Sequence, residues 1–515
     1  MKLNYKRTIL VGFAFFLIST FWQAYDATIA LTLTNKFGMD QFWSGVIMAL
    51  DNILALFLLP LFGTLSDKCK SKSGRRTPFI RLGTFVAAIA LVGLSFVDNM
   101  QLQQIQAVSQ VDDPAALALI YDTQSQKELR TPEGMEFVLA EKFSKDEFVQ
   151  IRSTDDVKDV TNKDENKTPY TSFVVPARQA YAADQTSANP SPLIIFVAVL
   201  LVLLVAMGIF RSPAVALMPD VTIKPLRSKA NAIINLMGNA GGILVLLLGM
   251  GFAFNISGTA NAMMSYTPYY ITIAAVMVVA VVIFLATVKE PKWVAQMQSD
   301  SIRYGLQTDD EDGNGGDRKL TKSELTSLIC ILLSVALWYF GYNAVTSKYS
   351  VYAPNVLLKD YSTTMLIAQA CAIVAYVPAG IIASKVGRKK TILAGVVMLT
   401  AAFAIASFMR PNSPAWAMYI MFALAGVAWA TINVNSFPMV VEMCSGSNVG
   451  KYTGFYYTAS MAAQTLTPML SGYLMNQHGM TVLFPYAAIF SGLAFVTMLL
   501  TRHGDTKLDT AAGNE

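Results

Sequence analysis

Long apolar runs, separated by short polar segments, dominate this chain. Each run has about 20 residues or more, the length that a helix needs to cross the hydrocarbon core of a bilayer. The first run is too long for the core of a signal peptide and has no small-residue cleavage site, so we expect it to be retained. The pattern predicts twelve membrane-spanning helices, at residues 8–35, 41–66, 77–97, 192–219, 230–254, 268–288, 325–347, 361–384, 391–409, 414–441, 452–477 and 480–501.

Two polar stretches interrupt this pattern. The first, residues 99–191, lies between the third and fourth predicted helices and is acidic, with 15 Asp and Glu against 9 Lys and Arg. Its part at 153–170 is too polar for a core, whereas other parts carry enough apolar residues for a small folded cap. The second stretch, 289–324, contains an acidic run and a glycine run within 309–316, which predict a flexible linker.

The two sets of six predicted helices repeat one another. A proline and a glycine near the end of a helix, followed by a Gly-Arg turn, occur at 60–76 and again at 378–390. We therefore expect a first half at 1–290, which includes the acidic insertion, a cytoplasmic linker at 291–324 and a second half at 325–515. Transporters built from such repeats usually bind their substrate near the bilayer midplane, between the repeats.

The placement of basic residues predicts the orientation of the chain. Only 14% of its 515 residues are charged, against roughly 25% in soluble domains. With the N-terminus inside, the inner segments hold 24 of the 39 Lys and Arg, and the short outer loops hold Lys36, Lys348, Lys359 and Arg410. We expect a multi-pass protein of the plasma membrane with both termini in the cytoplasm. The basic inner face accounts for the net charge of +5, so no nucleic-acid partner is expected.

Several functional classes lack support in the sequence. The four cysteines, Cys69, Cys330, Cys371 and Cys444, have neither disulfide nor metal-ligand spacing. The sequence contains no glycine-rich phosphate loop, nucleophile triad or ATPase domain. We therefore expect no enzyme activity, no cofactor and no metal, and we expect transport to draw its energy from an ion gradient.

Three charged residues, Asp26, Asp51 and Arg211, lie well inside predicted helices. A charge at the centre of a bilayer costs on the order of 3 kcal/mol or more, so such residues usually pair and usually act in transport. We expect them to couple a proton to transport, with an aspartate whose proton affinity depends on Arg211 and on the substrate. A permanent structural ion pair is the alternative. The oxygens of Asp51 and Asn52 would also suit Na⁺.

Polar and aromatic stripes on five predicted helices suit a sugar. Sugar rings bind flat apolar faces, and their hydroxyls bind amides and hydroxyls. Each stripe alone is as readily explained by packing between helices. The candidate substrate-binding residues are Trp22, Gln23, Tyr25, Asn52, Trp338, Tyr342, Asn343, Trp429, Asn433, Tyr456 and Gln464.

Acidic and basic residues at the inner ends of the predicted helices suit a conformational latch. Charge-assisted hydrogen bonds between them would hold one conformation and release in another. Ordinary basic residues of the inner face are the alternative. The predicted latch consists of Asp67, Arg75, Arg76, Asp220, Arg388 and Glu442.

The loop that carries this latch also resembles a known family. Its pattern P-L-F-G-x-x-S-D-K-C-x-S-x-x-G-R-R-x-P-F-I, at residues 60–80, resembles that of the sucrose/proton symporters within the major facilitator superfamily. Residues 213–239 resemble the junction of their fourth and fifth helices, and residues 429–438 resemble the glycoside–pentoside–hexuronide:cation symporters. The resemblance covers the first five helices well, the second half loosely and the insertion not at all.

This resemblance implies a fold and an activity. The fold is an all-α, major-facilitator-type bundle of 12 transmembrane helices in two pseudo-symmetric six-helix halves. The activity is proton-coupled uptake of a sugar, a disaccharide or other glycoside, by a monomer that alternates its access to the two sides of the bilayer.

Two helices depart from the family pattern, the fourth and the second. The fourth helix is apolar near Leu204, where plant sucrose carriers have an aspartate for protons, and Ala55 and Leu59 replace the paired aspartates of the melibiose carriers. The coupling residue therefore lies elsewhere, and the three buried charges are the candidates. A drug or metabolite:proton antiporter on the same scaffold, or a non-transporting membrane sensor with the insertion outside, are the alternative functions.

We predict that the insertion faces the outside of the cell. A Ser125→Cys variant, with the four native cysteines replaced by serine, should react with a membrane-impermeant thiol reagent in intact cells. Labelling that appears only after lysis would reverse the predicted orientation.

Overall fold

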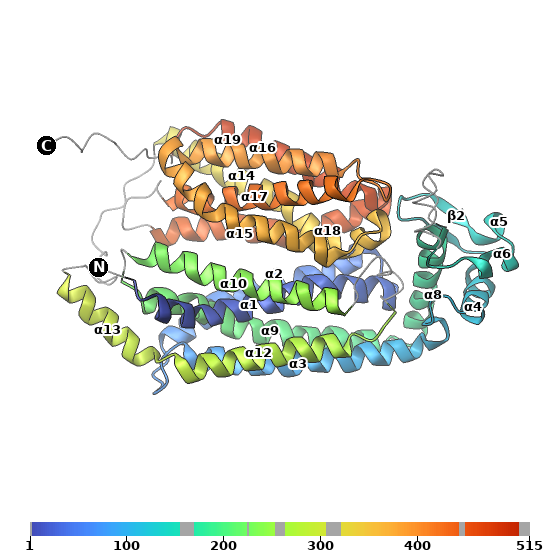
Figure 1. The fold of residues 1–515 in the computed structure, drawn as a ribbon, viewed down its shortest axis with the longest axis horizontal. Helices are drawn as coiled ribbons and strands as arrows, with labels where there is room; N and C mark the ends of the chain where they lie inside the picture. Colours follow the sequence, from blue (N-terminus) through green and yellow to red (C-terminus); the bar gives the residue numbers. More distant parts are fainter. Residues whose placement is uncertain are drawn as a thin grey trace.

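The computed structural model describes residues 3–154, 169–223, 226–252, 263–304, 321–441 and 449–503. Two sets of long helices, one from each part of the chain, lie against each other, and a small cap covers one end (Figure 1). The start of helix α1 (Tyr5–Leu31) and the end of helix α19 (Leu483–Leu499) lie at the opposite end, which we call the termini end. The predicted all-α membrane bundle is confirmed.

Each half supplies six of the long helices and packs around its own apolar core. The first half contains α1 (Tyr5–Leu31), α2 (Gln41–Asp67), α3 (Thr77–Gln104), α9 (Ser191–Asp220), α10 (Arg227–Gly251) and α12 (Thr267–Thr287). The second half contains α14 (Lys322–Tyr352), α15 (Tyr361–Val386), α16 (Arg388–Ala406), α17 (Ala415–Val441), α18 (Val449–His478) and α19 (Leu483–Leu499). A short 3₁₀ turn, η8 (Met480–Val482), joins α18 to α19.

The halves repeat each other in one detail of the backbone. The first helix of each half continues into a five-residue π-helical turn, η1 (Thr32–Lys36) after α1 and η6 (Ala353–Leu357) after α14. Such turns are rare and widen the helix locally. Their recurrence at the same place supports the internal repeat that the sequence indicates.

The observed helices match the predicted spans closely. Among the described residues, eleven helices have the length and hydropathy of a membrane span. The twelfth, α18, packs in the bundle against α2 and α14, but it is less apolar because polar side chains such as Gln464 recur along it. The third helix ends at Gln104, beyond the predicted end at 97, because its last turns support the cap.

The prediction of a flexible linker over 289–324 is wrong for the first part of that segment. Residues Glu290–Arg303 form α13, which begins directly after the first half and packs back on it. Its Trp293 ring lies 5.3 Å from the guanidinium of Arg7. The acidic and glycine runs within 309–316 lie outside the described residues.

The acidic insertion folds as a cap with its own apolar core. Most of the segment at 153–170, which the sequence marks as too polar for a core, lies outside the described residues. A two-stranded antiparallel hairpin, β1 and β2, places Leu129 opposite Phe137, and both side chains are buried. The elements of the cap are η2 (Gln106–Val108), α4 (Pro114–Gln124), β1 (Glu128–Arg130), β2 (Glu136–Val138), α5 (Leu139–Lys142), α6 (Lys145–Gln150), η3 (Tyr170–Val174) and α8 (Val175–Ala188).

Two lysines that the sequence places in outer loops are instead fully buried in helical turns. Lys36 forms an ion pair with Asp98 at 2.6 Å, and neither side chain is exposed. The same ammonium donates to the carbonyl oxygen of Met264 at 2.7 Å and lies 3.6 Å from the ring centroid of Tyr266. Lys348 donates to the carbonyl oxygen of Gln41, described below. Helix ends longer than predicted account for the error.

The two halves are joined at the cap end. Lys348 of α14 donates to the carbonyl oxygen of Gln41 at 2.6 Å and to the hydroxyl of Ser44 at 3.0 Å. Nearby, α2 and α18 approach so closely that a Cβ atom on Gly45 or on Gly472 would lie 2.1 Å from a backbone oxygen of the other helix. Small residues permit such close helix packing. Among the described residues, the hydrogen bonds between the halves lie in the cap-end half of the bundle, which is therefore closed there.

We predict that the Lys36–Asp98 pair stabilises the first half. Asp98→Ala leaves a buried ammonium without its counter-ion and should cost about 3–5 kcal/mol, whereas replacing both residues with apolar ones (Lys36→Met with Asp98→Leu) should recover most of that loss. Thermal unfolding in detergent measures both. Lys127→Ala is the control, because its ion pair with Asp184 is about half exposed and contributes about 1 kcal/mol or less. An Asp98→Ala protein that melts with the parent would contradict the prediction.

Candidate functional site

A polar cavity of about 170 Å³ lies between the two halves. It brings together all three buried charges predicted from the sequence, Asp26 of α1, Asp51 of α2 and Arg211 of α9, with polar residues of α14 and α18. Its lining consists of Trp22, Tyr25, Asp26, Met48, Asp51, Asn52, Arg211, Asn343, Thr346, Ser347, Gln464 and Pro468. Eight of these residues are among those predicted from the sequence.

The charges of this cavity do not form a direct ion pair. Across the described ranges, no contact of 4.0 Å or less joins Arg211 to either aspartate. The guanidinium of Arg211 lies instead over the ring of Trp22, 5.4 Å from its centroid. Asp51 accepts a hydrogen bond of 2.7 Å from the side-chain amide of the adjacent Asn52. In this conformation a ligand or a carboxylate can therefore approach the guanidinium of Arg211.

A second cavity of about 150 Å³ adjoins the first, and Thr346 lines both. One of its walls is a stacked aromatic pair, Tyr342 and Trp429, with ring centroids 3.6 Å apart and planes within 4°. Amides of Asn239 and Gln369 line it as well. A flat aromatic face beside amide groups can bind a ring that has one apolar face and a polar edge.

Four predicted substrate-binding residues do not line either cavity. Gln23 donates to the hydroxyl of Tyr361 at 2.9 Å and joins the halves. Trp338 is only 1% exposed and belongs to the apolar core of the second half. Tyr456 is also buried and lies 3.0 Å from the hydroxyl of Ser436. Asn433 forms a side-chain hydrogen bond with Tyr376, which lines the second cavity.

The sequence analysis missed several lining residues. Gln369 and Tyr376 were detectable, because they are polar members of the apolar helix α15, seven residues apart and so on one face. Met48 and Pro468 carry no comparable signal, since apolar residues at those positions are typical of any membrane helix. The packing of the two halves decides which face of each helix lines the cavity. The sequence of a single helix does not show that packing.

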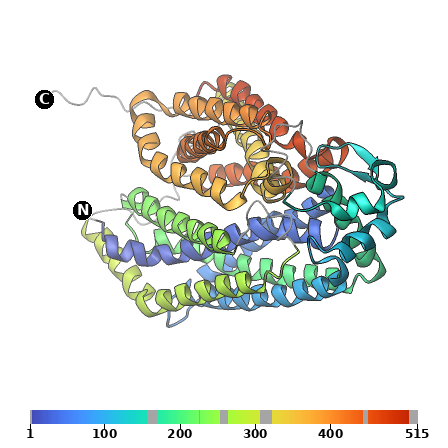
Figure 2. The same ribbon diagram turned by 45° about the vertical axis from the view of Figure 1, so that its right-hand side comes forward.

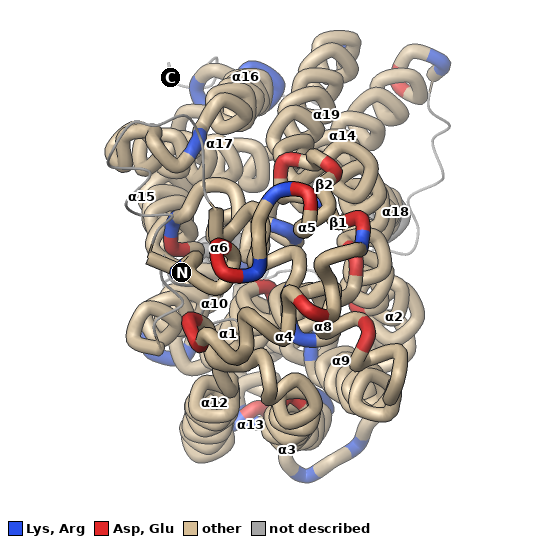
Figure 3. Tube along the Cα trace, turned by 90° about the vertical axis from the view of Figure 1, so that its right-hand side faces the viewer, with Lys and Arg blue, Asp and Glu red and all other residues tan. Residues whose placement is uncertain are grey.

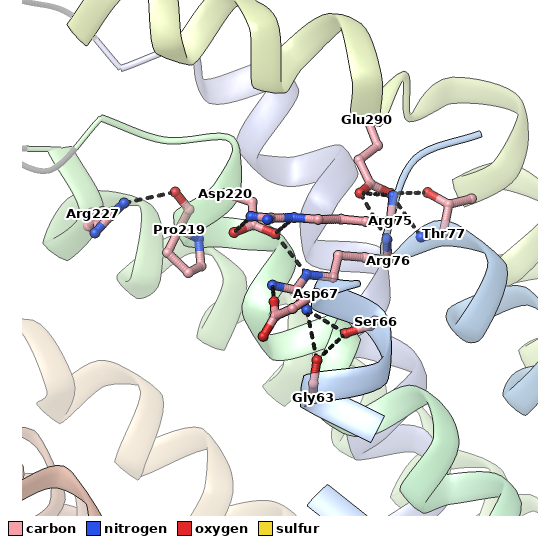
Figure 4. Close-up of polar contacts among 10 residues, drawn as sticks. All are labelled: Gly63, Ser66, Asp67, Arg75, Arg76, Thr77, Pro219, Asp220, Arg227 and Glu290. Atoms are coloured by element: carbon pink, nitrogen blue, oxygen red, sulfur yellow. Dashed lines mark hydrogen bonds and ion pairs between the residues drawn. The ribbon is translucent and has the colours of Figure 1, made fainter. Parts of the chain in front are cut away.

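Four of the six predicted latch residues form one network at the termini end of the first half (Figure 4). Arg75 makes two hydrogen bonds to the carboxylate of Asp220, at 2.6 and 3.1 Å, and Arg76 donates to the same carboxylate at 2.8 Å. Arg76 also pairs with Asp67 at 2.5 Å. We call this set, with Glu290, the arginine cluster. Burial alone would lower the pKa of Arg75, but the bond to Asp220 and the nearby carboxylates raise it above the ordinary value, so the guanidinium stays charged.

Glu290, which the sequence analysis did not select, completes the arginine cluster. Its carboxylate accepts hydrogen bonds from the backbone N–H groups of Arg75, Arg76 and Thr77, at 2.7–3.2 Å, and so caps the first turn of α3. A carboxylate at this end also favours the helix dipole. Gly74 has φ +112° and lies so close that a Cβ atom would be 2.2 Å from Glu290 Oε2. The cluster thus joins α2, α3, α9 and α13 into one unit.

The other two members of the predicted latch, Arg388 and Glu442, belong to the second half, and only Arg388 is among the described residues. Arg388 begins α16, and the neighbouring Lys389 donates to the carbonyl oxygens of Leu499 and Thr501, at 2.9 and 2.6 Å. Glu442 lies outside the described residues. The contacts of the arginine cluster given above all lie within the first half and are made while the cap end is closed.

Comparison with known proteins agrees with this architecture. Residues 10–108 match the family described as MFS/sugar transport protein, and residues 335–514 match the Major Facilitator Superfamily. The two matches together cover more than half of the chain and fall in different halves. The chain belongs to the major facilitator superfamily. This facilitator is therefore a membrane transporter by family and fold, and not an enzyme.

The relatives that it resembles match it only in part. An MFS-type transporter, ppzB, of Metarhizium rileyi is 28% identical over 137 residues, which are 26% of this chain and 28% of that protein. A sucrose transport protein of Arabidopsis thaliana is 34% identical over 76 residues, which are 15% of this chain and 13% of that protein. The matched regions thus span less than a third of either relative. The inward-open structure of the xylose transporter XylE from E. coli has the same fold, with a TM-score of 0.60, 14% identity and 98% of both chains covered.

If the arginine cluster acts as a conformational latch, Asp67→Asn should slow turnover and leave the substrate affinity near normal. The expected loss is modest, about threefold, because Asp67 is 57% exposed and Asp220 also holds Arg76. Asp220→Asn, which affects both arginines, should cost more. Initial rates over a range of substrate concentrations separate the two parameters.

Asp300→Asn, an exposed acid of α13 that is not among the members of the cluster, is the control. A collapse of affinity with unchanged turnover in Asp67→Asn would place this residue in substrate binding instead.

Proposed function

We propose that this facilitator takes up a sugar, a disaccharide or other glycoside, together with a proton, by alternating access. The observation that carries the proposal is the polar cavity of about 170 Å³ between the halves, called the central cavity below. In it, two aspartates and an arginine meet amides from both halves and aromatic rings of α1. Carboxylates, amides and aromatic faces are the groups that bind sugar hydroxyls and ring C–H groups. The two adjoining cavities offer room for a ligand of more than one ring. Because one chain supplies both walls, a monomer suffices.

The closed cap end supports the alternating-access part of the proposal. The cavity lies between halves that are held together on the cap side by Lys348, Gln41 and Ser44. Opening on that side requires these contacts to break while the halves rock about the cavity. The basic termini end faces the cytoplasm in this proposal, so the cap faces the outside of the plasma membrane.

Coupling follows from the arrangement of charge. A substrate that binds Arg211, or that displaces water from the cavity, changes the field at Asp51 and therefore its proton affinity. Linkage is reciprocal, so the proton changes the affinity for the sugar by the same factor. A symporter requires that each promotes binding of the other. Asp26 lies in the same cavity, and we propose that it contacts sugar hydroxyls.

The first experiment is counterflow of labelled mono- and disaccharides in proteoliposomes. A sugar symporter exchanges its substrate without any gradient of ions. A drug antiporter would ignore all sugars, and a sensor would exchange nothing. Imposing a proton gradient or a Na⁺ gradient in the same vesicles then identifies the coupling ion.

We predict that Asp51→Asn abolishes uphill accumulation of the sugar but keeps exchange within about threefold of the parent, since exchange needs no net proton release. Asp26→Asn should instead weaken sugar binding in both assays by roughly tenfold, the size of a lost hydrogen bond to a charged group. Gradient-driven uptake and equilibrium exchange are measured on the same vesicles. An Asp51→Asn protein that still concentrates sugar, and stops when a protonophore is added, would exclude Asp51 as the proton site.

A further inference from the structure

The cap is rooted in the first half. Gln179 of α8 donates to the side-chain oxygen of Asn35 in η1 at 2.6 Å. Gln101, near the end of α3, donates to the hydroxyl of Thr186 at 3.1 Å and to the carbonyl oxygen of Lys36 at 2.8 Å. Both ends of the cap are also covalently continuous with first-half helices, α3 and α9. The cap therefore moves with the first half.

One loop of the cap reaches across to the second half. This loop, residues 130–135, runs from the last residue of β1 to the start of β2. It meets residues 476–480, which are the end of α18 and the turn that follows it. A guanidinium nitrogen of Arg130 donates to the carbonyl oxygen of Asn476 at 2.6 Å. The backbone N–H of Met480 donates to the carbonyl oxygen of Pro132, also at 2.6 Å. Figure 2 shows the cap lying across the ends of both sets of helices.

The two backbones are in direct contact where the loop crosses the turn. Gly134 has φ +94° and Gly479 has φ +83°, conformations that residues with side chains rarely adopt. A Cβ atom on Gly134 would lie 2.9 Å from the backbone nitrogen of Gly479, and one on Gly479 would lie 2.4 Å from the carbonyl group of Glu133. No side chain separates the two backbones here, so this contact can form only where both segments have glycine.

The same turn takes part in the closed cap end. The side-chain oxygen of Asn476 accepts a hydrogen bond of 3.0 Å from the backbone N–H of Gln41, whose own carbonyl oxygen binds Lys348. Asn476 is therefore held by the cap and by α2 at once. A pocket of about 140 Å³ at this junction is lined by the cap, by the start of α2 and by the end of α18.

We propose that residues 130–135 are a strap that holds the cap end closed and must detach from residues 476–480 each time this end opens. When α2 and α18 separate, the cap follows the first half and the turn follows the second, so the strap contacts break with the Gln41–Asn476 bond. Two hydrogen bonds at a solvent-accessible surface contribute modestly, so the strap biases the equilibrium between closed and open states without locking it. Figure 3 shows the cap end facing the viewer, with β1 and β2 of the cap in front of the long helices. The proposal rests on the alternating-access part of the proposed function and on no property of the substrate.

A reversible crosslink tests whether the strap must detach. Pro132→Cys and Met480→Cys, combined in a protein whose native cysteines are serines, should join on oxidation or with a short bis-thiosulfonate reagent. Transport should then fall at least about tenfold and return on reduction. Full transport in the crosslinked protein, or a pair that no reagent joins, would overturn the proposal.

A second measurement follows the conformation without any substrate. Ser347→Cys in the central cavity is shielded from the cap side in the closed state, so its labelling by an impermeant reagent in intact cells reports opening. Arg130→Ala should raise this labelling rate by roughly threefold to tenfold, the effect of one hydrogen bond from a charged donor. Lys145→Ala is the matched control, because its 2.6 Å ion pair with Asp122 lies wholly within the cap.

Equal labelling in Arg130→Ala and Lys145→Ala would overturn the strap. Gly479→Val, which places a side chain against the loop, should act in the same direction as Arg130→Ala. A protein that opens faster in this assay but moves no sugar would refute the proposed substrate and leave the strap intact, so the two failures are distinguishable.

Discussion

The cost of placing charge in an apolar medium organises this molecule. A buried ion is stable only where hydrogen bonds or an opposite charge replace the water it has lost. The ammonium of Lys36 contacts a carboxylate, a carbonyl oxygen and an aromatic ring. These contacts hold η1, α3 and the start of α12 together. Lys348 has only the neutral oxygens of Gln41 and Ser44 among the contacts described, so the ammonium is held less firmly where the halves must part. A buried charge with an opposite charge beside it thus marks a contact that stays fixed, and one with only neutral partners marks a contact that can break when the halves move.

The same principle separates the two arginine sites. In the arginine cluster, Arg75 and Arg76 are matched by Asp67 and Asp220, and the cluster binds four helices of one half into a unit. Arg211 in the central cavity has an aromatic ring beside it and carboxylates at a distance. A guanidinium left in that condition strongly favours an incoming acceptor. A transporter whose halves rock about a central site needs rigid halves and, at the site, a charged group that is free to bind the substrate.

The sequence was most informative where one physical rule decides the structure. Twelve apolar runs had to form helices, because only helices satisfy the backbone of a single segment inside a bilayer. Asp26, Asp51 and Arg211 could be found from sequence because a charge in such a run is costly, and they do share one cavity. Trp338 and Tyr456 show where prediction from the sequence fails. An aromatic ring is equally common in an apolar core and in a binding site, and these two rings are buried. Glu290 was hidden for another reason: its partners are backbone N–H groups 213–215 residues away, which leave no mark on the pattern of side chains.

The position of the cap has a consequence for how this transporter could be inhibited. A molecule that bridges the cap and the turn at 476–480 binds the closed state better than the open one and shifts the population by its differential affinity. It would act without entering the central cavity, so raising the concentration of sugar would not displace it. An antibody fragment seated on the hairpin of β1 and β2 would have this non-competitive character, and its epitope would be set by the cap rather than by features that this protein shares with the rest of its superfamily.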